Sequence, residues 1–283
     1  MTRQSKTAPW VLAAAVLAAT AGFAVSQEQP AESGKALLIE GSTTVGPIAD
    51  AFAEAFEAMG HKVQVKKTGS GDGAAALIDG RCEVATMSRF MKPGEFKKAV
   101  DKGIMPVAHV VAMDGVCVIV HPSNPIGALS RDQVKQIYEG KTTNWKQLGG
   151  PDQPVVAISR DTSSGTYECF HEIVMRKAGM GERVEYVNSN PAAHDRVAAT
   201  RGGIAYVGLA FVDRKVKALK IDGITPSKKT IASGTYPVAR PLFLFTAGYP
   251  KLGSLIYQFV TFHLSEKGHE IIDAKKFVPL TDY

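Results

Sequence analysis

The chain of 283 residues has few cysteines and lacks a recognisable metal motif. Its three cysteines, Cys82, Cys117 and Cys169, form no CxxC pair, and its seven histidines show no zinc-ligand spacing such as HExxH. Three thiols allow at most one disulfide within the chain, and which two would pair is open. The sequence therefore predicts neither a bound metal nor a cofactor.

Catalytic constellations are also lacking. The chain has many serines, but none has a partner histidine at a recognisable spacing, and no GxSxG elbow surrounds Ser42, Ser70 or Ser164. Nucleophilic catalysis needs a nucleophile, a base and an orienting group within reach of one another. We therefore expect a protein that is not an enzyme.

An apolar run lies at the N-terminus, over residues 10–25, and follows the basic residues Arg3 and Lys6. The run is shorter than a usual membrane span and ends in small residues that suit signal peptidase. We predict a signal peptide over 1–26 and a polar tail over 27–35, and hence a soluble periplasmic protein. No cysteine near the cleavage region can carry a lipid, and a retained N-terminal anchor is the alternative.

Charge is modest and dispersed. The formal net charge is +6, and basic residues are scattered among acidic ones apart from pairs such as Lys66-Lys67. Together with an export signal, this pattern argues against nucleic-acid binding, whereas it is consistent with diffuse steering of an anion. Removal of residues 1–26 from the 283 leaves 257, which is enough for two lobes of ordinary domain size.

Strand-like and helix-like segments alternate through most of the chain, which favours parallel sheets covered by helices. Polar clusters follow four of the predicted strands. They are Ser42-Thr43-Thr44 after 37–39, Gly69 to Gly73 after 63–65, Ser88-Arg89 after 84–87, and Arg160 to Thr166 after 155–158. Helices are expected after three of them, over 48–59, 74–79 and about 167–178. Binding sites in open α/β sheets form outside the carboxyl ends of strands, so these clusters predict a site.

The cluster Arg160 to Thr166 has the chemistry of an oxyanion site. An arginine offers a planar fork of donors that matches phosphate or carboxylate oxygens. Ser163, Ser164 and Thr166 add hydroxyls, and a helix that begins here would point free backbone N–H groups at the anion. A helix cap does not need the arginine. For the Ser42 or the Ser70 cluster alone, ordinary capping or a flexible turn is a sufficient explanation.

The chain resembles the phosphate-binding proteins of bacterial ABC importers, which have the type II periplasmic binding protein fold. The resemblance spans nearly the whole mature chain. It rests on residues 39–45, 68–71, 88–89, 160–166, 203–208, 218–223 and 233–242. It implies two lobes, each a mostly parallel sheet flanked by helices, joined by a two-strand hinge that lets the lobes close on a ligand.

The resemblance also implies which residues hold the phosphate oxygens. Ser42, Thr43, Thr44, Ser70, Ser88 and Arg89 would bind from lobe one, and Arg160, Ser164, Gly165 and Thr166 from lobe two.

One position departs from some members of the family, which have an acidic residue where this chain has Arg89. That acid accepts the ligand's proton, and a buried acceptor left unpaired would penalise sulfate, whereas arginine has no acceptor atom. Asp72 and Asp161 are the candidate replacements. The alternatives are a helix-end charge for Asp72 and an ion pair that orients Arg160 for Asp161.

A polar break at Ala112-Met113-Asp114-Gly115 predicts the first crossing between lobes, and the return is expected near 237–241. The resemblance then assigns 36–114 and 239–283 to lobe one and 115–238 to lobe two. A monomer is expected that binds inorganic phosphate and docks on the membrane permease subunits of an importer. The alternatives are binding of another tetrahedral oxyanion, such as sulfate, molybdate or tungstate, and a phosphate sensor without a transport role.

Overall fold

The computed structural model describes residues 1–2 and 35–280, and residues 34–283 form one structural unit. Nearly all of the predicted signal peptide and of the polar tail lies outside the described residues. Within the described part of the chain, no helix is long and apolar enough to cross a membrane.

One mixed sheet of nine strands runs through the unit, in the order β2-β1-β3-β11-β4-β8-β6-β7, with β9 paired to β4. Its strands are β1 (Leu37–Gly41), β2 (Val63–Lys67), β3 (Val84–Met87), β4 (Pro106–Val120), β6 (Val156–Arg160), β7 (Glu185–Val187), β8 (Gly203–Gly208), β9 (Lys217–Ala218) and β11 (Ala239–Ala247). The short strands β5 (Ala128–Leu129) and β10 (Lys220–Ile221) form a separate parallel pair.

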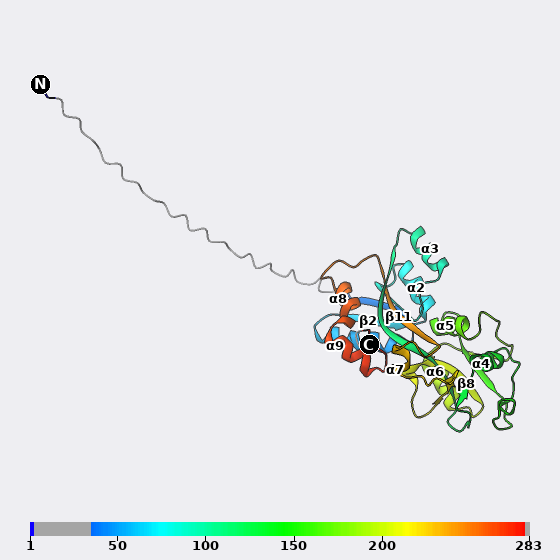
Figure 1. Cartoon of the computed structure of the whole chain (residues 1–283). Coiled ribbons are helices and arrows are strands. Elements are labelled where there is room, and N and C mark those ends of the chain that lie inside the picture. Colours follow the sequence, from blue (N-terminus) through cyan, green and yellow to red (C-terminus); the bar gives the residue numbers. More distant parts are fainter. Residues whose placement is uncertain (3–34, 281–283) are drawn as a thin grey trace. The chain divides into compact units, whose positions relative to one another are not determined.

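Strand direction divides the sheet into two halves. β1 pairs in parallel with β2 and β3, and β6 pairs in parallel with β7 and β8. The antiparallel strands β11 and β4 lie between these groups. We call the half with β1, β2 and β3 lobe one, and the half with β6, β7 and β8 lobe two. β4 and β11 are the two strands that connect the lobes, which is the two-strand hinge of the type II periplasmic binding protein fold (Figure 1).

The helices cover both faces of the sheet. They are α1 (Gly46–Ala58), α2 (Ser70–Ile78), α3 (Pro93–Asp101), α4 (Arg131–Tyr138), α5 (Gly165–Ile173), α6 (Asn190–Ala198), α7 (Lys228–Ala232), α8 (Leu255–Thr261) and α9 (Glu266–Ala274), with 3₁₀ turns at η1 (Trp145–Leu148), η2 (Leu209–Phe211) and η3 (Phe262–Leu264). In lobe one, Phe52 of α1 and Phe259 of α8 join one core cluster, and Leu77 of α2 joins another. In lobe two, Phe170 of α5 and Val197 of α6 belong to different clusters. Each lobe therefore has its own cores.

Local sequence explains where the helices begin. Pro47 occupies the first turn of α1, where its missing N–H costs nothing. The Ser130 hydroxyl accepts a hydrogen bond from the N–H of Gln133, and Gln133 Oε1 accepts one from the N–H of Ser130. This capping box starts α4. Ile48, Phe52 and Phe56 are buried as the apolar spacing predicts, while Met59 just past the end of α1 is exposed.

Two predicted helix boundaries are wrong. The predicted lobe crossing at 112–115 is a different case: it lies within a continuous strand, because β4 runs through it and Met113 and Gly115 pair with β11. α2 begins at Ser70, so the glycines taken for a turn form its first turn. α5 ends at Ile173, since Arg176 and Lys177 have positive φ angles that end a right-handed helix. The exact bounds of the two lobes stay a prediction.

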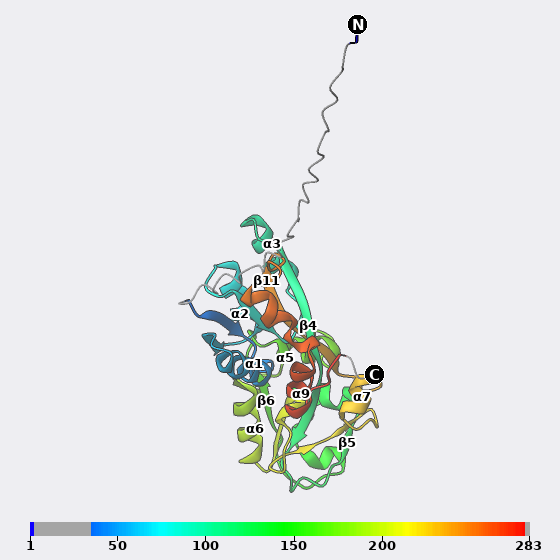
Figure 2. The same cartoon turned by 90° about the vertical axis from the view of Figure 1, so that its left-hand side faces the viewer.

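The long strand β4 extends through both lobes. In Figure 2 it runs from the end that carries α3 toward the end that carries β5. Asp114, near the middle of β4, lies directly opposite Arg240 of β11. A point where both hinge strands meet is therefore also a point where two opposite charges face each other.

Candidate anion-binding site

Four helix starts meet where the two lobes touch. Thr44, just before α1, shares a hydrogen bond of 3.0 Å with Thr166 in the first turn of α5. Asn190, the first residue of α6, donates from Nδ2 to Thr43 Oγ1 at 3.2 Å and Thr44 Oγ1 at 2.9 Å. Gly165, the first residue of α5, lies so close to Ser70 of α2 that a Cβ on it would be 2.5 Å from Ser70 Oγ. Helix N-termini carry partial positive charge, so this arrangement favours an anion.

Ser164 caps α5, and Ser42 stabilises the turn just before α1. Ser42 Oγ accepts hydrogen bonds from the N–H groups of Thr44 and Val45, and Ser164 Oγ accepts from those of Thr166 and Tyr167. A hydroxyl that accepts bonds still has its own proton to donate. These local hydrogen bonds are therefore compatible with anion binding by the same two hydroxyls.

Ser70 and Ser88 of lobe one lie next to each other at the place where α5 of lobe two packs on lobe one. Their hydroxyls lie 3.2 Å apart, and Ser88 N–H donates to Ser70 Oγ at 3.0 Å. Both side chains are buried. Gly165 of lobe two packs on both, because a Cβ there would also be 2.6 Å from Ser88 Oγ. A side chain at 165 would hold the lobes apart.

Arg160 ends β6 and is 1% exposed. Its Nε donates to the carbonyl oxygen of Val187 at 3.3 Å and its Nη2 to that of Asn188 at 2.9 Å. Its Nη1 is buried and has no partner among the described residues. Burial, with a smaller contribution from the charge of Arg240, lowers the pKa of Arg160 to about 10. A buried guanidinium with a spare donor is a group that an anion would stabilise.

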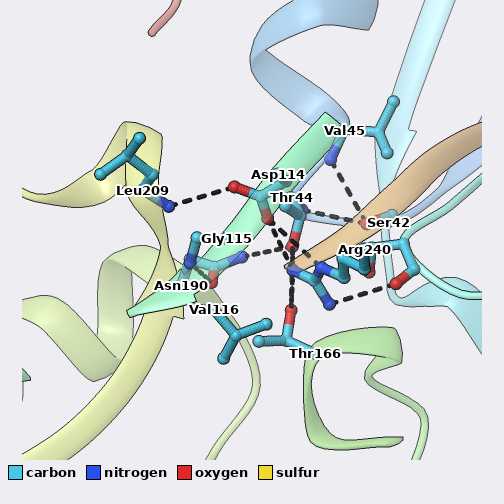
Figure 3. A network of polar contacts seen from close by, with 12 residues as sticks. Ser42, Thr44, Val45, Asp114, Gly115, Val116, Thr166, Asn190, Leu209 and Arg240 are labelled. Atoms are coloured by element: carbon cyan, nitrogen blue, oxygen red, sulfur yellow. Dashed lines mark hydrogen bonds and ion pairs between the residues drawn. The ribbon is translucent and has the colours of Figure 1, made fainter. Parts of the chain in front are cut away.

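Arg240 and Asp114 complete the charged centre, although the sequence predicts a role in the site for neither of them. Arg240 Nη2 lies 3.0 Å from Asp114 Oδ2, and both side chains are buried. Burial raises the pKa of Asp114. Arg240 and the N–H groups of Leu209 and Gly115 act in the opposite direction and make the rise smaller. Figure 3 shows the Arg240 guanidinium between Thr44, Thr166 and Asp114. Nothing local in the sequence marks this pair, because its members are far apart along the chain.

Arg89 follows Ser88, and both terminal nitrogens of its guanidinium already donate hydrogen bonds. Its two terminal nitrogens donate to the Glu95 carboxylate at 2.8 and 2.7 Å, and Nη1 also donates to the carbonyl oxygen of Phe90. Its Nε is buried without a partner among the described residues. Contact between Arg89 and a ligand stays a prediction.

The two predicted proton acceptors differ in their surroundings. Asp72, in the first turn of α2, is exposed to solvent. Asp161 is half-buried, and its Oδ1 accepts bonds from the N–H and the hydroxyl of Ser163 at 2.9 and 2.6 Å. Selection by an unpaired acceptor needs burial, so the position of Asp72 suits that role poorly. Asp161 is nearer the conditions of the role, but it already accepts two bonds.

All three cysteines are buried free thiols, and no disulfide joins them within residues 35–280. In the same residues, no group of three or more histidine, cysteine, aspartate or glutamate side chains could hold a metal ion.

Comparisons with known proteins all indicate the same protein family. Residues 25–267 match the model of the PBP superfamily domain. Protein SphX of Synechococcus elongatus is 31% identical, with 96% of this chain and 86% of that protein covered, and the phosphate-binding protein PstS of Bacillus subtilis is 32% identical, with 87% and 81% covered.

Solved structures agree with the sequence relatives. A substrate-binding protein from Clostridium perfringens, solved with bound phosphate, has a TM-score of 0.79 and 31% identity, and 87% of this chain and all of that chain are covered. An ABC-type phosphate transport receptor from Vibrio cholerae has a TM-score of 0.71 and 28% identity, with 86% and 99% covered.

Proposed function

The chain belongs to the PBP superfamily and to its PstS-like phosphate-binding members, and from this premise we propose that it binds one inorganic phosphate between its lobes. The observation that carries the proposal is the unpartnered Nη1 of the buried Arg160, an arginine whose pKa is lowered chiefly by burial and further by the charge of Arg240. A buried guanidinium donor that lacks a partner costs free energy unless an anion binds to it.

The surrounding donors fit a tetrahedral anion. Hydroxyls of Ser42, Thr44 and Ser70 approach from lobe one, and Ser164, Gly165 and Thr166 bring the start of α5 from lobe two. Hydrogen bonds to a charged group are each worth about 1.5–3 kcal/mol, so several together support micromolar binding or tighter, about −8 kcal/mol or better. Contacts of Thr43, Ser88 and Arg89 with the ligand are part of the same proposal.

We extend the proposal to transport. The closed protein would deliver phosphate to the membrane permease subunits of an ABC importer, as a monomer in the periplasm, and would carry out no catalysis. Contacts that join the lobes support a closing mechanism, since Gly71 N–H donates to the Ser163 carbonyl oxygen at 2.9 Å. Neither lobe alone holds the full set of donors.

Sulfate is the second candidate ligand. Asp72 is exposed and Asp161 is already hydrogen-bonded, so neither is a buried free acceptor that would reject an anion without a proton. Molybdate and tungstate share the tetrahedral shape and belong in the same competition.

Thermal unfolding of the ligand-stripped mature protein tests the proposal, with phosphate and sulfate titrated at constant ionic strength. A ligand that binds only the native state stabilises it by RT ln(1 + [L]/Kd), and the melting temperature rises as a result. A rise with phosphate alone supports phosphate binding, and equal rises indicate a general oxyanion binder. Absence of a rise with either anion would refute the proposal. Arg160→Met should remove the rise, whereas the exposed Arg201→Gln should retain it.

A further inference from the structure

Arg240 lies on a hinge strand rather than on a loop at a helix start. It belongs to β11, opposite Asp114 of β4, and is 5% exposed. Its Nε and Nη2 donate to Asp114 Oδ2 at 3.3 and 3.0 Å. The carboxylate therefore fixes one edge of the guanidinium and directs the other edge away from β4.

The rest of the guanidinium reaches both lobes. Nη2 donates to Thr166 Oγ1 of lobe two at 3.0 Å and approaches Thr44 Oγ1 of lobe one at 3.4 Å. Nη1 donates to the carbonyl oxygen of Ser88 at 3.1 Å. These three partners are all among the residues predicted to bind the ligand, so Arg240 lies within the predicted donor set (Figure 3).

Charge gives Arg240 a further importance. The buried charged groups at the centre are Arg160, Arg240 and Asp114, with one net positive charge, while the half-buried Asp161 lies at the edge. Without Arg240, the buried Arg160 and Asp114 would cancel. Two buried guanidinium groups close enough for one to lower the pKa of the other repel each other, and a bound anion relieves that repulsion.

Resting on the proposed function, we propose that Arg240 is a second anion-binding arginine, that it binds the same phosphate as Arg160, and that Asp114 is its positioning residue. Phosphate oxygens replace the weaker hydroxyl contacts of Nη2, because bonds between an ionised donor and acceptor are roughly twice as strong as neutral ones. Since Arg240 lies where the two hinge strands pair, the ligand is held from the hinge as well as from both lobes.

Asp114 also connects Arg240 to lobe two. Its Oδ1 accepts a bond from the N–H of Leu209 at 3.1 Å, and Gly208 packs so closely that a Cβ there would be 3.0 Å from Oδ2. Its oxygens are occupied by donors from Arg240 and the backbone, so the carboxylate orients the arginine and does not itself contact the anion.

The test compares the phosphate Kd of the mature protein with that of Arg240→Gln, Arg240→Lys, Asp114→Asn and the double variant Asp114→Asn/Arg240→Gln, by calorimetric titration, with Tm without ligand measured separately. We expect R240Q to weaken binding at least tenfold and R240K to weaken it less, because lysine keeps the charge and lacks the fork. D114N should weaken binding less than R240Q and add little to it in the double variant, since Asp114 acts through Arg240. The exposed Arg201→Gln is the control.

The outcomes separate the two proposals. If the parent protein does not bind phosphate, the proposed function fails. If it binds and folded R240Q keeps the parent Kd, whatever its Tm, the second anion-binding arginine is refuted. Should R240Q fail to fold, R240K decides: a several-fold loss of affinity supports the inference and an unchanged Kd overturns it. Additive losses for D114N and R240Q would overturn the positioning role of Asp114.

Discussion

Gly165 at the start of α5 packs on Ser70 at the start of α2, so that a Cβ on Gly165 would lie 2.5 Å from Ser70 Oγ. These residues belong to different lobes. The φ angle of Gly165 lies outside the left-handed region, so its lack of a side chain serves close approach rather than backbone freedom. The closed arrangement of the lobes therefore depends on a residue without a side chain at this contact.

Gly165→Ala should weaken phosphate binding about tenfold or more, which corresponds to about 1.4 kcal/mol. The added methyl group meets Ser70 and Ser88 only when the lobes approach, so it opposes the closed state. Calorimetric titration with phosphate measures the change. The free energy of unfolding of each lobe's core should be little altered.

Gly179→Ala is the matched control, because a Cβ at Gly179 would meet nothing within 4 Å. It should bind phosphate as the parent does. Equal affinities for Gly165→Ala and the parent would show that the contact between α5 and α2 does not take part in binding.

Sequence predicted the parts of the site that follow strands. Ser42, Ser70 and Arg160 lie where polar residues end predicted strands, and alternating elements require such ends to meet at one edge. The starts of β1, β2 and β3 and the existence of the three predicted helices followed from hydrophobic pattern and capping, whereas β1, β2 and β6 each extend two residues beyond their predicted ends. This reasoning works because it uses contacts between residues close in sequence.

The remaining parts depend on contacts between distant residues. From the sequence, Asp114 and Arg240 fall at the two predicted lobe crossings, at 112–115 and 237–241, and only the pairing of β4 with β11 shows that they face each other. Asn190 starts α6 after Ser189 caps it, so its own contact with Thr44 has no local signal. Tertiary contacts, rather than local propensity, decide which polar side chains form the site.

Asp114→Ala should destabilise the protein by about 3–5 kcal/mol, because it leaves the buried Arg240 without its carboxylate. Urea unfolding in the absence of ligand measures this loss. Arg240→Met combined with Asp114→Ala should cost less than Asp114→Ala alone, since neither member of this ion pair is then left buried without the other. A loss below about 1 kcal/mol for the single variant would contradict this account.

His194 of α6 should make stability depend on pH. Its Nδ1 and Nε2 each lie 2.8 Å from a carboxylate oxygen, of Asp195 and Asp213 respectively, and both nitrogens can donate only in the protonated imidazolium. Burial acts to lower the pKa of His194, but the bonds to Asp213 and Asp195 outweigh it and raise the pKa. A raised folded-state pKa gives stability that is complete below the unfolded value of about 6.5 and is lost as pH rises through the folded value.

Urea unfolding between about pH 5 and pH 9 should therefore show a decline in the free energy of unfolding that His194→Gln reduces. His121→Gln is the control, because the ring of His121 bonds Ser123 rather than a carboxylate. Identical pH profiles for His194→Gln and the parent would rule out His194 as the source of the decline.

Lys92, at the N-cap of α3 in lobe one, forms an ion pair with Glu168 in the first turn of α5 in lobe two. The pair joins the lobes outside the ligand donors, so it stabilises closure without contacting phosphate. Lys92→Met keeps much of the aliphatic stem and removes the charge, and it should speed phosphate release up to about fivefold, because partly exposed pairs are worth about 0.2–1 kcal/mol. Lys92 is the better target, since loss of Glu168 would also remove a negative charge near the anion.

Stopped-flow displacement of phosphate measures the release rate, and added salt should reduce the difference between Lys92→Met and the parent because salt screens the pair. Lys97→Met is the matched control: Lys97 lies on the same helix but pairs with Asp101 within α3, so its loss leaves the contact between lobes intact. If both variants release phosphate at the same rate, the charge of Lys92 does not hold the lobes together. If Lys92→Met alone releases it faster, closure is stabilised by a contact that the ligand never touches.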